Sequence, residues 1–429
     1  MVKKILMSIL MMLVVFSVFA GGGKEASQTK DTKKAETAME TVTLDFWSWR
    51  TEDVDVYNDL IAQFREKNPG IDVNFTAYKN TEYNTVLSAA LSGESGPDII
   101  HLKAYGGLET YAQPGYLMPL DDKIPALKNF DPNAVRGATS ISDGKIYGVP
   151  FASQTLVIFY NKALYKELGL SVPETWAQFL ANLDVMKKAG ITPLANGGKD
   201  GWTLEVLQGV ICPNFYGAND YFTELTSGKA KFTDDRYRTS LEKLLELRPY
   251  MPENFMGIAY TDMQMLFINE MAGHFIGGSW EAGYFSAQNP DLDYDVFAGP
   301  VAKAGDTRYA SAFLDGSFGM NADTENPEEA TAFLNFLAST QAGQFLADSL
   351  KQKSDVPGVK FTDPYLKKLG ELNVNSTPYI TLVGFRYEQP TGSALIQSTL
   401  QGFLADSIDS TEVVRQVQEG VATWYKPFQ

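Results

Sequence analysis

The chain has 429 residues, 44% of them apolar and 21% charged, which is enough for a large core spread over two or three domains and excludes a disordered or small disulfide-stapled protein. Its formal net charge of −16 argues against nucleic acid as a partner, because that partner would be held mainly through phosphates. One cysteine, Cys212, permits no internal disulfide, and two histidines leave little material for a zinc cluster. We therefore expect neither a metal nor another cofactor.

The first 20 residues are typical of a Sec signal peptide. Lys3 and Lys4 precede an apolar run over 5–16, and small residues ending at Ala20 provide a cleavage site. The run is shorter than the roughly 20 apolar residues of a spanning helix, although a retained membrane anchor is the alternative. No cysteine follows the run, so no lipoprotein anchor is predicted and the mature chain is expected outside the cytoplasm. Residues 21–41 have no apolar period, which indicates a disordered tether.

The folded part is predicted to begin with alternating strands and helices. Apolar residues alternate over 42–47, 71–75 and 98–102, which indicates three strands. Between them, apolar residues at 57, 60, 61 and 64 and again at 83, 86, 87, 90 and 91 have helical spacing. The order strand, helix, strand, helix, strand predicts a mostly parallel sheet with helices on its faces.

A second α/β unit is predicted to start with the apolar run 156–160. Pro173 and Gly190 suit the start and the end of a helix. The remaining predicted helices cover 162–168, 174–189, 202–211, 234–247, 261–271, a segment from Pro327 and the tail 394–424; the remaining strands cover 274–276, 293–297 and 313–320. No internal repeat is visible, so we expect two α/β lobes and no third domain.

Several short stretches, in this order and spread over the mature chain, together resemble the sugar-binding proteins of bacterial ABC importers, the group that includes maltose-binding protein. They are Leu44-Asp45-Phe46-Trp47-Ser48-Trp49, Asn68-Pro69-Gly70-Ile71, Gly96-Pro97-Asp98-Ile99, Gly148-Val149-Pro150-Phe151, Pro173-Glu174-Thr175-Trp176, Gly278-Ser279-Trp280, Gly316-Ser317-Phe318-Gly319 and Asn326-Pro327-Glu328-Glu329-Ala330.

The resemblance implies a two-lobed, type II-like periplasmic-binding-protein fold, in which each lobe is a mostly parallel sheet flanked by helices and a multi-strand hinge joins the lobes. Crossovers are expected at 152–154, 310–314 and 352–358. The N-lobe would comprise 42–152 and 311–354, and the C-lobe 153–310 and 355–429. The ligand would lie between the lobes, at the carboxyl ends of the strands.

A sugar presents hydroxyls to polar side chains and C–H faces to aromatic rings, which directs the search for its site. In the first lobe we select Trp49 and Glu52 after the first strand, and His101 and Lys103 at the end of the third. Gln154 lies at the first crossover. The alternatives are a structural histidine, a helix-capping role for Glu52 and a core position for either tryptophan of the first strand.

In the second lobe, Trp202 precedes a helix, and Trp280 follows two glycines that would let a ligand approach the backbone. Asp315, expected at a strand start on the second crossover, and Arg386, in a late loop, occupy places where relatives present polar groups to the sugar. Trp176 lies in an amphipathic helix, which indicates a packing role instead.

The resemblance implies a carrier that closes around a sugar or oligosaccharide and docks as a monomer on the permease subunits of an ABC importer. No catalytic residue is predicted. The rival from another class is a secreted glycoside hydrolase, since carboxylates beside aromatic rings also serve that chemistry. Cargo of iron, polyamine or phosphate on the same fold is a further alternative, although the sequence has no adjacent tyrosines of the kind that iron carriers use. Signalling to a membrane receptor is left open.

Overall fold

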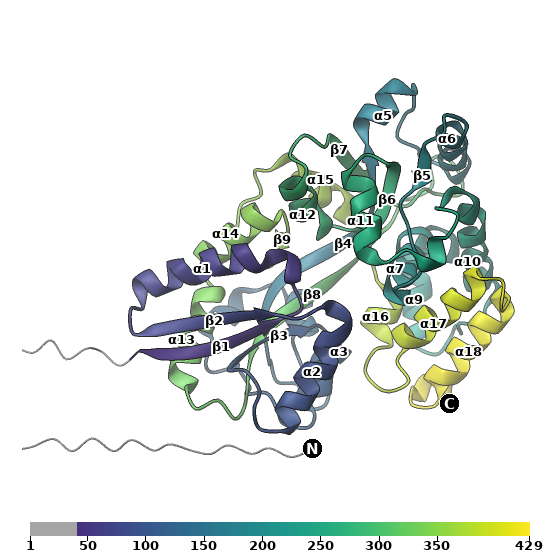
Figure 1. Ribbon diagram of the computed structural model, residues 1–429. Helices are drawn as coiled ribbons and strands as arrows, with labels where there is room; N and C mark the ends of the chain where they lie inside the picture. The colour runs from purple at the N-terminus through teal and green to yellow at the C-terminus, as the bar shows by residue number, and fades with distance from the viewer. Residues whose placement is uncertain (1–40) are drawn as a thin grey trace, which may run out of the picture. The chain divides into compact units, whose positions relative to one another are not determined.

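A computed structural model describes residues 41–429, and Figure 1 shows these residues as a mixed α/β structure. The predicted signal peptide and all but the last residue of the predicted tether lie outside the described residues. Within the described part, no helix has both the length and the apolar character needed to cross a membrane.

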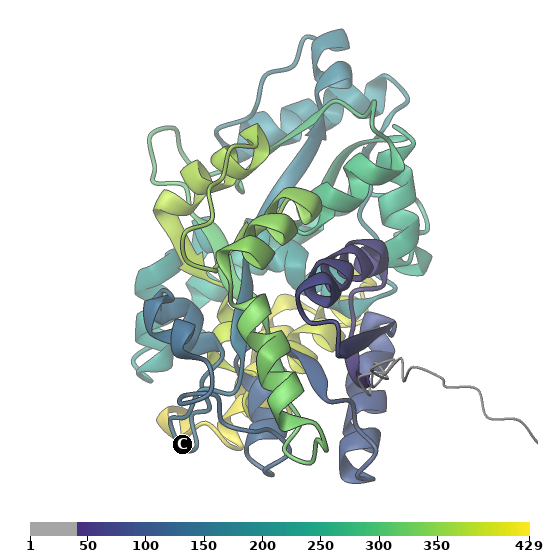
Figure 2. The same cartoon turned by 90° about the vertical axis from the view of Figure 1, so that its left-hand side faces the viewer.

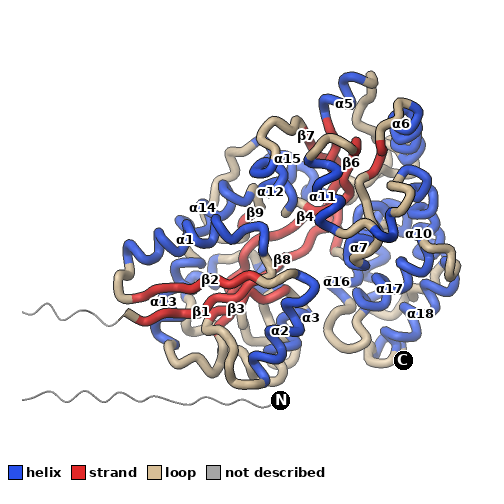
Figure 3. Tube along the Cα trace, viewed as in Figure 1, coloured by secondary structure: helices blue, strands red, loops and turns tan. Residues whose placement is uncertain are grey.

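The described strands form one continuous sheet in the order β2-β1-β3-β8-β4-β6-β5, with β10 beside β8 and with β7 and β9 beside β4. Figure 3 shows β1, β2 and β3 at one end of this sheet and β5 and β6 at the other. The strands are β1 (Val42–Ser48), β2 (Ile71–Ala77), β3 (Ile99–Lys103), β4 (Val149–Asn161), β5 (Thr192–Leu194), β6 (Ala272–Gly278), β7 (Tyr294–Phe297), β8 (Ala310–Met320), β9 (Lys353–Ser354) and β10 (Ser376–Pro378).

The helices cover the faces of this sheet. The α-helices are α1 (Val54–Lys67), α2 (Asn80–Ser92), α3 (Gly106–Ala112), α4 (Pro132–Gly137), α5 (Lys162–Glu167), α6 (Trp176–Lys188), α7 (Gly201–Ile211), α8 (Pro213–Tyr216), α9 (Ala218–Thr226), α10 (Asp235–Leu247), α11 (Tyr260–Ile268), α12 (Glu281–Gln288), α13 (Pro327–Leu337), α14 (Thr340–Leu350), α15 (Pro364–Leu372), α16 (Ile380–Gly384), α17 (Gly392–Leu404) and α18 (Ser410–Ala422). Short 3-10 turns include η1 (Thr51–Asp53). In Figure 2, α1 (purple) lies beside α14 (green), although the two are far apart in the sequence.

The sheet is mixed, which modifies the prediction of mostly parallel lobes. The pairs β1/β2, β1/β3, β5/β6 and β8/β10 are parallel. In contrast, β8 is antiparallel to β3 and β4, and β4 is antiparallel to β6, β7 and β9. The reason is that β4 and β8 run between the two ends of the sheet in opposite directions. Each of them therefore lies antiparallel to the other and to a strand at one end of the sheet, β3 for β8 and β6 for β4.

β4 joins the two ends of the sheet. Its first part pairs with β8 and its second part, from Leu156, pairs with β6. The pairing with β8 shifts register around Ala152, which is a bulge that lets the strand bend. The expected crossovers at 152–154 and 310–314 lie in β4 and β8, and β9 lies in the third, 352–358. The lobe boundaries drawn from them remain a prediction.

Two aromatic clusters anchor the strand ends from which the site is built. Beneath β1, Phe46 packs edge-on against Tyr57, with ring centroids 5.7 Å apart, and against Phe318 of β8 at the same distance. Near β6, Phe159 and Phe285 pack edge-on at 5.3 Å. Through these pairs the strands pack against each other and against the helices α1 and α12, which carry Tyr57 and Phe285.

The prediction of a packing role for Trp176 agrees with its position. The residue is buried, and its Nε1 donates a hydrogen bond of 2.7 Å to Glu246. Thr175 caps α6 and forms a capping box with Gln178, and Gly190 follows the helix with a φ of +78°.

Candidate ligand-binding site at the lobe junction

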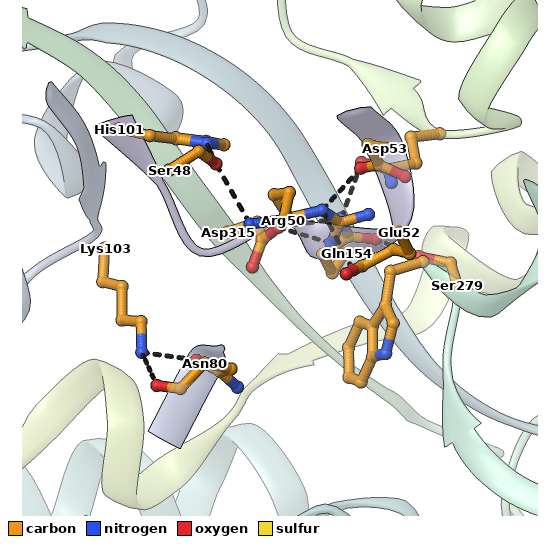
Figure 4. A network of polar contacts seen from close by, with 12 residues as sticks. Ser48, Arg50, Glu52, Asp53, Asn80, His101, Lys103, Gln154, Ser279 and Asp315 are labelled. Carbon is orange, nitrogen blue, oxygen red and sulfur yellow. Dashed lines mark hydrogen bonds and ion pairs between the residues drawn. The ribbon is translucent and has the colours of Figure 1, made fainter. Parts of the chain in front are cut away.

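Arg50 is the centre of a buried carboxylate cluster that follows β1 (Figure 4). Its Nε lies 2.6 Å from Asp53 Oδ2 and 3.3 Å from Glu52 Oε1, and its Nη1 lies 3.6 Å from Asp315 Oδ2. The Arg50 side chain is only 3% exposed, and its Nη2 has no hydrogen-bond partner among the described residues. The single positive charge of Arg50 therefore lies close to three carboxylates, and the Nη2 group makes no hydrogen bond to the described residues.

Burial changes the ionisation of this cluster. It raises the pKa of Asp53 to about 6, although the charge of Arg50 pulls in the opposite direction. Burial also raises the pKa of Asp315, against the same opposing effect of Arg50. The charge of Arg50 thus favours the ionised form of both carboxylates.

Gln154 connects the cluster to the crossover strands. Its Nε2 donates to Asp315 Oδ2 at 3.2 Å and to Gln352 Oε1 at 3.0 Å, and its Oε1 accepts from Ser279 Oγ at 2.6 Å. The amide is fully buried and links β4, β8, the segment before β9 and the turn after β6 (Figure 4). The predicted residues Gln154 and Asp315 are therefore brought together. Asp315 lies in the middle of β8, not at a strand start as predicted, because β8 already begins at Ala310 beside β10.

His101 lies behind Trp49. It is fully buried, its ring stacks on the Trp49 indole with centroids 4.1 Å apart, and its Nδ1 lies 2.9 Å from Ser48 Oγ. Burial holds the pKa of His101 well below its usual value, so the ring is neutral. Trp49 itself is 6% exposed. The structure thus places His101 as a support for the indole, and the ligand-binding roles of both residues remain predictions.

Lys103 also lies near Trp49. Its Nζ lies 5.4 Å from the indole centroid and donates to Asn80 Oδ1 at 2.6 Å. Burial, together with the charge of Arg386, lowers the pKa of Lys103 to about 7. Arg386 lies in the loop after α16, and this loop packs directly on the start of α3, since a Cβ on Gly106 would come within 1.9 Å of the Arg386 carbonyl oxygen.

Three half-buried aromatic side chains form a second surface, here called the aromatic wall: Trp202, Tyr260 and Trp280. Trp202 lies edge-on to Tyr260 with centroids 4.6 Å apart, and its centroid is 6.4 Å from that of Trp280. They come from the start of α7, the start of α11 and the turn before α12. Two of the predicted site residues, Trp202 and Trp280, are therefore neighbours.

Glu281 was missed by sequence reasoning. It is 1% exposed, and its carboxylate accepts hydrogen bonds from Tyr260 and Trp280 of the aromatic wall. Burial raises the pKa of Glu281 to about 7, and the charge of Glu52 adds to the rise. An acidic residue in the first turn of a helix is usually a dipole-compensating surface residue, so the sequence carried no signal for this role.

The carboxylate cluster and the aromatic wall belong to one site, here called the junction site. The charges of Glu52 and Arg50 both reach Tyr260 and act on its pKa, which burial raises well above the usual value. Trp280 also approaches Phe313 of β8, with centroids 6.4 Å apart. Charged groups that follow β1 thus lie near aromatic rings carried by the other end of the sheet.

Two surface cavities lie elsewhere. One, of about 530 Å³, is lined mainly by charged side chains such as Lys351 and Asp363, which pair with each other. The other, of about 570 Å³, lies between the end of α6 and the segment 248–255. Neither includes a residue of the junction site. Among residues 41–429, no group of three or more His, Cys, Asp and Glu is arranged to hold a metal ion.

The two-lobed mixed sheet, with aromatic and charged groups meeting at the crossover strands, defines the class of solute-binding proteins. Residues 48–344 match the family model of bacterial extracellular solute-binding proteins, and the chain belongs to this family.

Two curated relatives and one solved structure illustrate the likeness. The chain is 28% identical over 345 residues to the Multiple sugar-binding protein of Streptococcus mutans, which covers 78% of each chain. It is 28% identical over 324 residues to the Putrescine-binding periplasmic protein PotF of Escherichia coli, covering 72% of this chain and 77% of that protein. The bacterial solute receptor AcbH shares the fold with a TM-score of 0.78 at 23% identity, over 90% of this chain and 100% of that chain.

Proposed function

We propose that the protein captures a sugar or oligosaccharide at the junction site, outside the cytoplasm, and delivers it unchanged to the permease of an ABC importer. The observation that carries the proposal is the nearness of the aromatic wall to the Arg50 carboxylate cluster. Further support comes from the name of the Streptococcus mutans relative, which is called a sugar-binding protein. The predicted signal peptide and a monomeric state are parts of the same proposal.

The chemistry of the junction site suits an uncharged polyhydroxylated molecule. Indole and phenol faces pack against sugar C–H groups, while carboxylates and amides exchange hydrogen bonds with hydroxyls. Arg50 Nη2, buried and without a partner among the described residues, offers a donor for one such hydroxyl. A ligand lacking that hydroxyl would leave a buried donor unpaired, which gives selectivity.

Transport requires that the ligand favour one conformation. A sugar that contacts both the carboxylate cluster and the aromatic wall binds the closed arrangement of the lobes more tightly than an open one, and it shifts the population accordingly. The permease then recognises the closed form. The bulge of β4 near Ala152 lies at the crossover where such bending would occur.

A polyamine is the second candidate cargo, favoured by the similarity to the putrescine-binding relative. A diamine needs carboxylates that are free to pair with it. Here Arg50 occupies the cluster of Glu52, Asp53 and Asp315, and Lys103 adds a further basic group near Asp315. The charge distribution therefore favours the sugar.

A hydrolase is disfavoured because these carboxylates and that of Glu281 are already engaged by protein donors.

The test is a thermal-shift screen of the mature protein with mono- and oligosaccharides and with putrescine, followed by calorimetry of each hit and chromatography of the recovered ligand. A saturating ligand at about 100 times its Kd adds about 2.7 kcal/mol to the free energy of unfolding, which is a measurable shift. We expect stabilisation by a sugar that is recovered intact. Cleaved sugar would indicate a hydrolase, stabilisation by putrescine alone would indicate a polyamine carrier, and no response to any sugar would refute the proposal.

The site assignment has its own control. Trp280→Ala should weaken binding of the sugar at least tenfold, because stacking on one aromatic ring contributes roughly 0.5–1.5 kcal/mol beyond the area it buries. Trp424→Ala serves as the matched variant, since Trp424 is also half-buried but lies after the end of α18, where it donates to the Pro390 carbonyl. Equal affinity of Trp280→Ala and wild type would show that the aromatic wall is not the binding surface.

A further inference from the structure

We propose that Glu281 is a positioning residue of the junction site, whose buried carboxylate sets the orientation of the Trp280 indole and the Tyr260 phenol. This inference rests on the proposed function in so far as the aromatic wall is the surface that holds the cargo. Glu281 does not need to contact the ligand; it sets the orientation of the Trp280 and Tyr260 rings that do.

The hydrogen bonds of Glu281 connect separate elements through one side chain. Its Oε1 accepts from Tyr260 Oη at 2.8 Å and from Trp280 Nε1 at 2.9 Å, and its Oε2 accepts from Gln264 Nε2 at 2.8 Å. Tyr260 and Gln264 belong to α11, whereas Trp280 lies in the turn after β6. A single carboxylate oxygen therefore fixes the spacing of two rings of the aromatic wall.

The indole of Trp280 is held from a second side by the backbone. A Cβ added to Gly278 would lie 1.9 Å from Trp280 Cζ3 and 2.2 Å from Cη2, so the benzo ring rests directly on this glycine. The glycine limits how far the ring can move toward the strand, and Glu281 holds the nitrogen edge. Together they leave the indole one orientation, in which it meets Trp202 and Phe313.

A carboxylate performs this task better than an amide. An ionised carboxylate has two acceptor oxygens and no donor, so it can satisfy all three donors at once. A glutamine would present an amino group where Oε2 faces Gln264, and neutral hydrogen bonds to the two rings would be weaker than charge-assisted ones. Burial of the carboxylate at 1% exposure makes these bonds insensitive to competition from water.

Protonation of Glu281 should loosen the wall. Its pKa is raised to about 7 by burial and by the charge of Glu52, so the carboxyl gains its proton as the pH falls through neutrality. The protonated oxygen then becomes a donor, so the carboxyl can no longer accept from Tyr260, Trp280 and Gln264 in their present orientations. The titratable and charged groups that interact with Glu281 or its partner Tyr260 are Glu52 and Arg50 near η1, Tyr260 of α11, Tyr284 of α12 and Tyr365 of α15.

The three tyrosines stay neutral in this range because burial raises the pKa of each above its ordinary value. Asp53, whose pKa is about 6, titrates nearby but is bound to Arg50. Lys103, whose Nζ lies 5.4 Å from the Trp49 indole centroid, also has a pKa of about 7. The contribution of Glu281 is therefore isolated by comparing the variants in a Lys103→Met background, in which that second titration is absent.

The experiment records tryptophan emission and near-UV circular dichroism of the unliganded mature protein from pH 5.5 to 8.5, together with sugar affinity at each pH. The variants are Glu281→Gln, Tyr260→Phe, which removes one donor but keeps the carboxylate, and Glu328→Gln as control. Glu328 is an exposed residue of the first turn of α13, so it matches Glu281 in sequence context but not in burial. Far-UV circular dichroism verifies that each variant is folded.

In the Lys103→Met background we expect a spectral transition near pH 7 when Glu281 is present, including in Glu328→Gln, and none in Glu281→Gln. At pH 8.5, Glu281→Gln should bind the sugar at least tenfold more weakly, in line with the loss of charged hydrogen bonds, and Tyr260→Phe should lose less. A transition that persists in Glu281→Gln, or wild-type spectra of that variant at pH 8.5, would overturn the inference. If no sugar binds the wild type, the proposed function fails, but the spectra of the unliganded protein still decide the role of Glu281.

Discussion

Replacing Arg50 with leucine tests whether the buried cluster depends on a single positive charge. The substitution keeps an apolar side chain but removes the positive partner of Asp53 and Asp315. Burial raises the pKa of both carboxyls even when Arg50 is present. The folded protein must then either hold unpaired carboxylates in a buried place or protonate them.

The magnitude follows from the geometry. Removing one partner of a buried ion pair typically costs about 3–5 kcal/mol of unfolding free energy, because the remaining charge is left without compensation. For a chain of this length the unfolding entropy is roughly 0.8 kcal/mol/K, so we expect Tm to fall by about 4–6 °C at pH 8. Additional replacement of Asp53 by asparagine should recover part of this loss.

The sign of the pH dependence is the sharper part of the test. A carboxyl whose folded pKa is raised above its unfolded value costs stability above the folded pKa, and this cost disappears as it protonates below that value. Asp53 has a pKa of about 6 with Arg50 in place, and its pKa rises further without Arg50. The difference in Tm between Arg50→Leu and the wild type should therefore shrink between pH 8 and pH 5.

Differential scanning calorimetry at pH 8, 6.5 and 5 measures this difference. Arg65→Leu is the matched control, since Arg65 of α1 pairs with Asp72 of β2 at the same end of the sheet but is half exposed, and such pairs contribute at most about 1 kcal/mol. A loss for Arg50→Leu that equals that of the control at pH 8, or that is as large at pH 5 as at pH 8, would refute the account of the cluster.

Two further predictions concern local structure. Thr175→Ala removes one half of the α6 capping box and should lower the free energy of unfolding by about 1 kcal/mol in chemical denaturation, whereas Thr175→Ser should be close to wild type. Gly106→Ala places a Cβ against the Arg386 carbonyl and should cost about 1–3 kcal/mol, while Gly370→Ala in α15, where the Cβ meets nothing within 4 Å, should be neutral or stabilising. Unchanged denaturation midpoints for Thr175→Ala or Gly106→Ala would contradict the respective contact.

The fold could be predicted where the pattern was local. In β1, Leu44 and Phe46 are buried and Thr43 and Asp45 are exposed, as the alternation indicated, and α6 ends before Gly190 as predicted. Strand direction could not be predicted, because the antiparallel placement of β8 depends on where the chain returns to the sheet. For the same reason Asp315 was expected at a strand start, although β8 begins earlier, beside β10.

The site was predicted in part. The adjacency of Trp202 with Trp280 and of Gln154 with Asp315 agrees with the selection of these residues, although their contact with ligand remains a prediction. Arg50 and Glu281 were not selected. Charged side chains beside a helix start are usually solvated, and only the tertiary structure reveals that both are buried and surrounded by partners.

The strand β4 takes part in both ends of the sheet, and this limits how the chain can be split into fragments or exchanged between relatives. The first part of β4 pairs with β8 and its second part pairs with β6. A single cut in the described chain therefore does not give two fragments that each keep all the strand pairs of one end of the sheet. Exchange of one half between relatives would need matched splice points in every segment that passes between the halves, so the two halves are expected to vary as a unit.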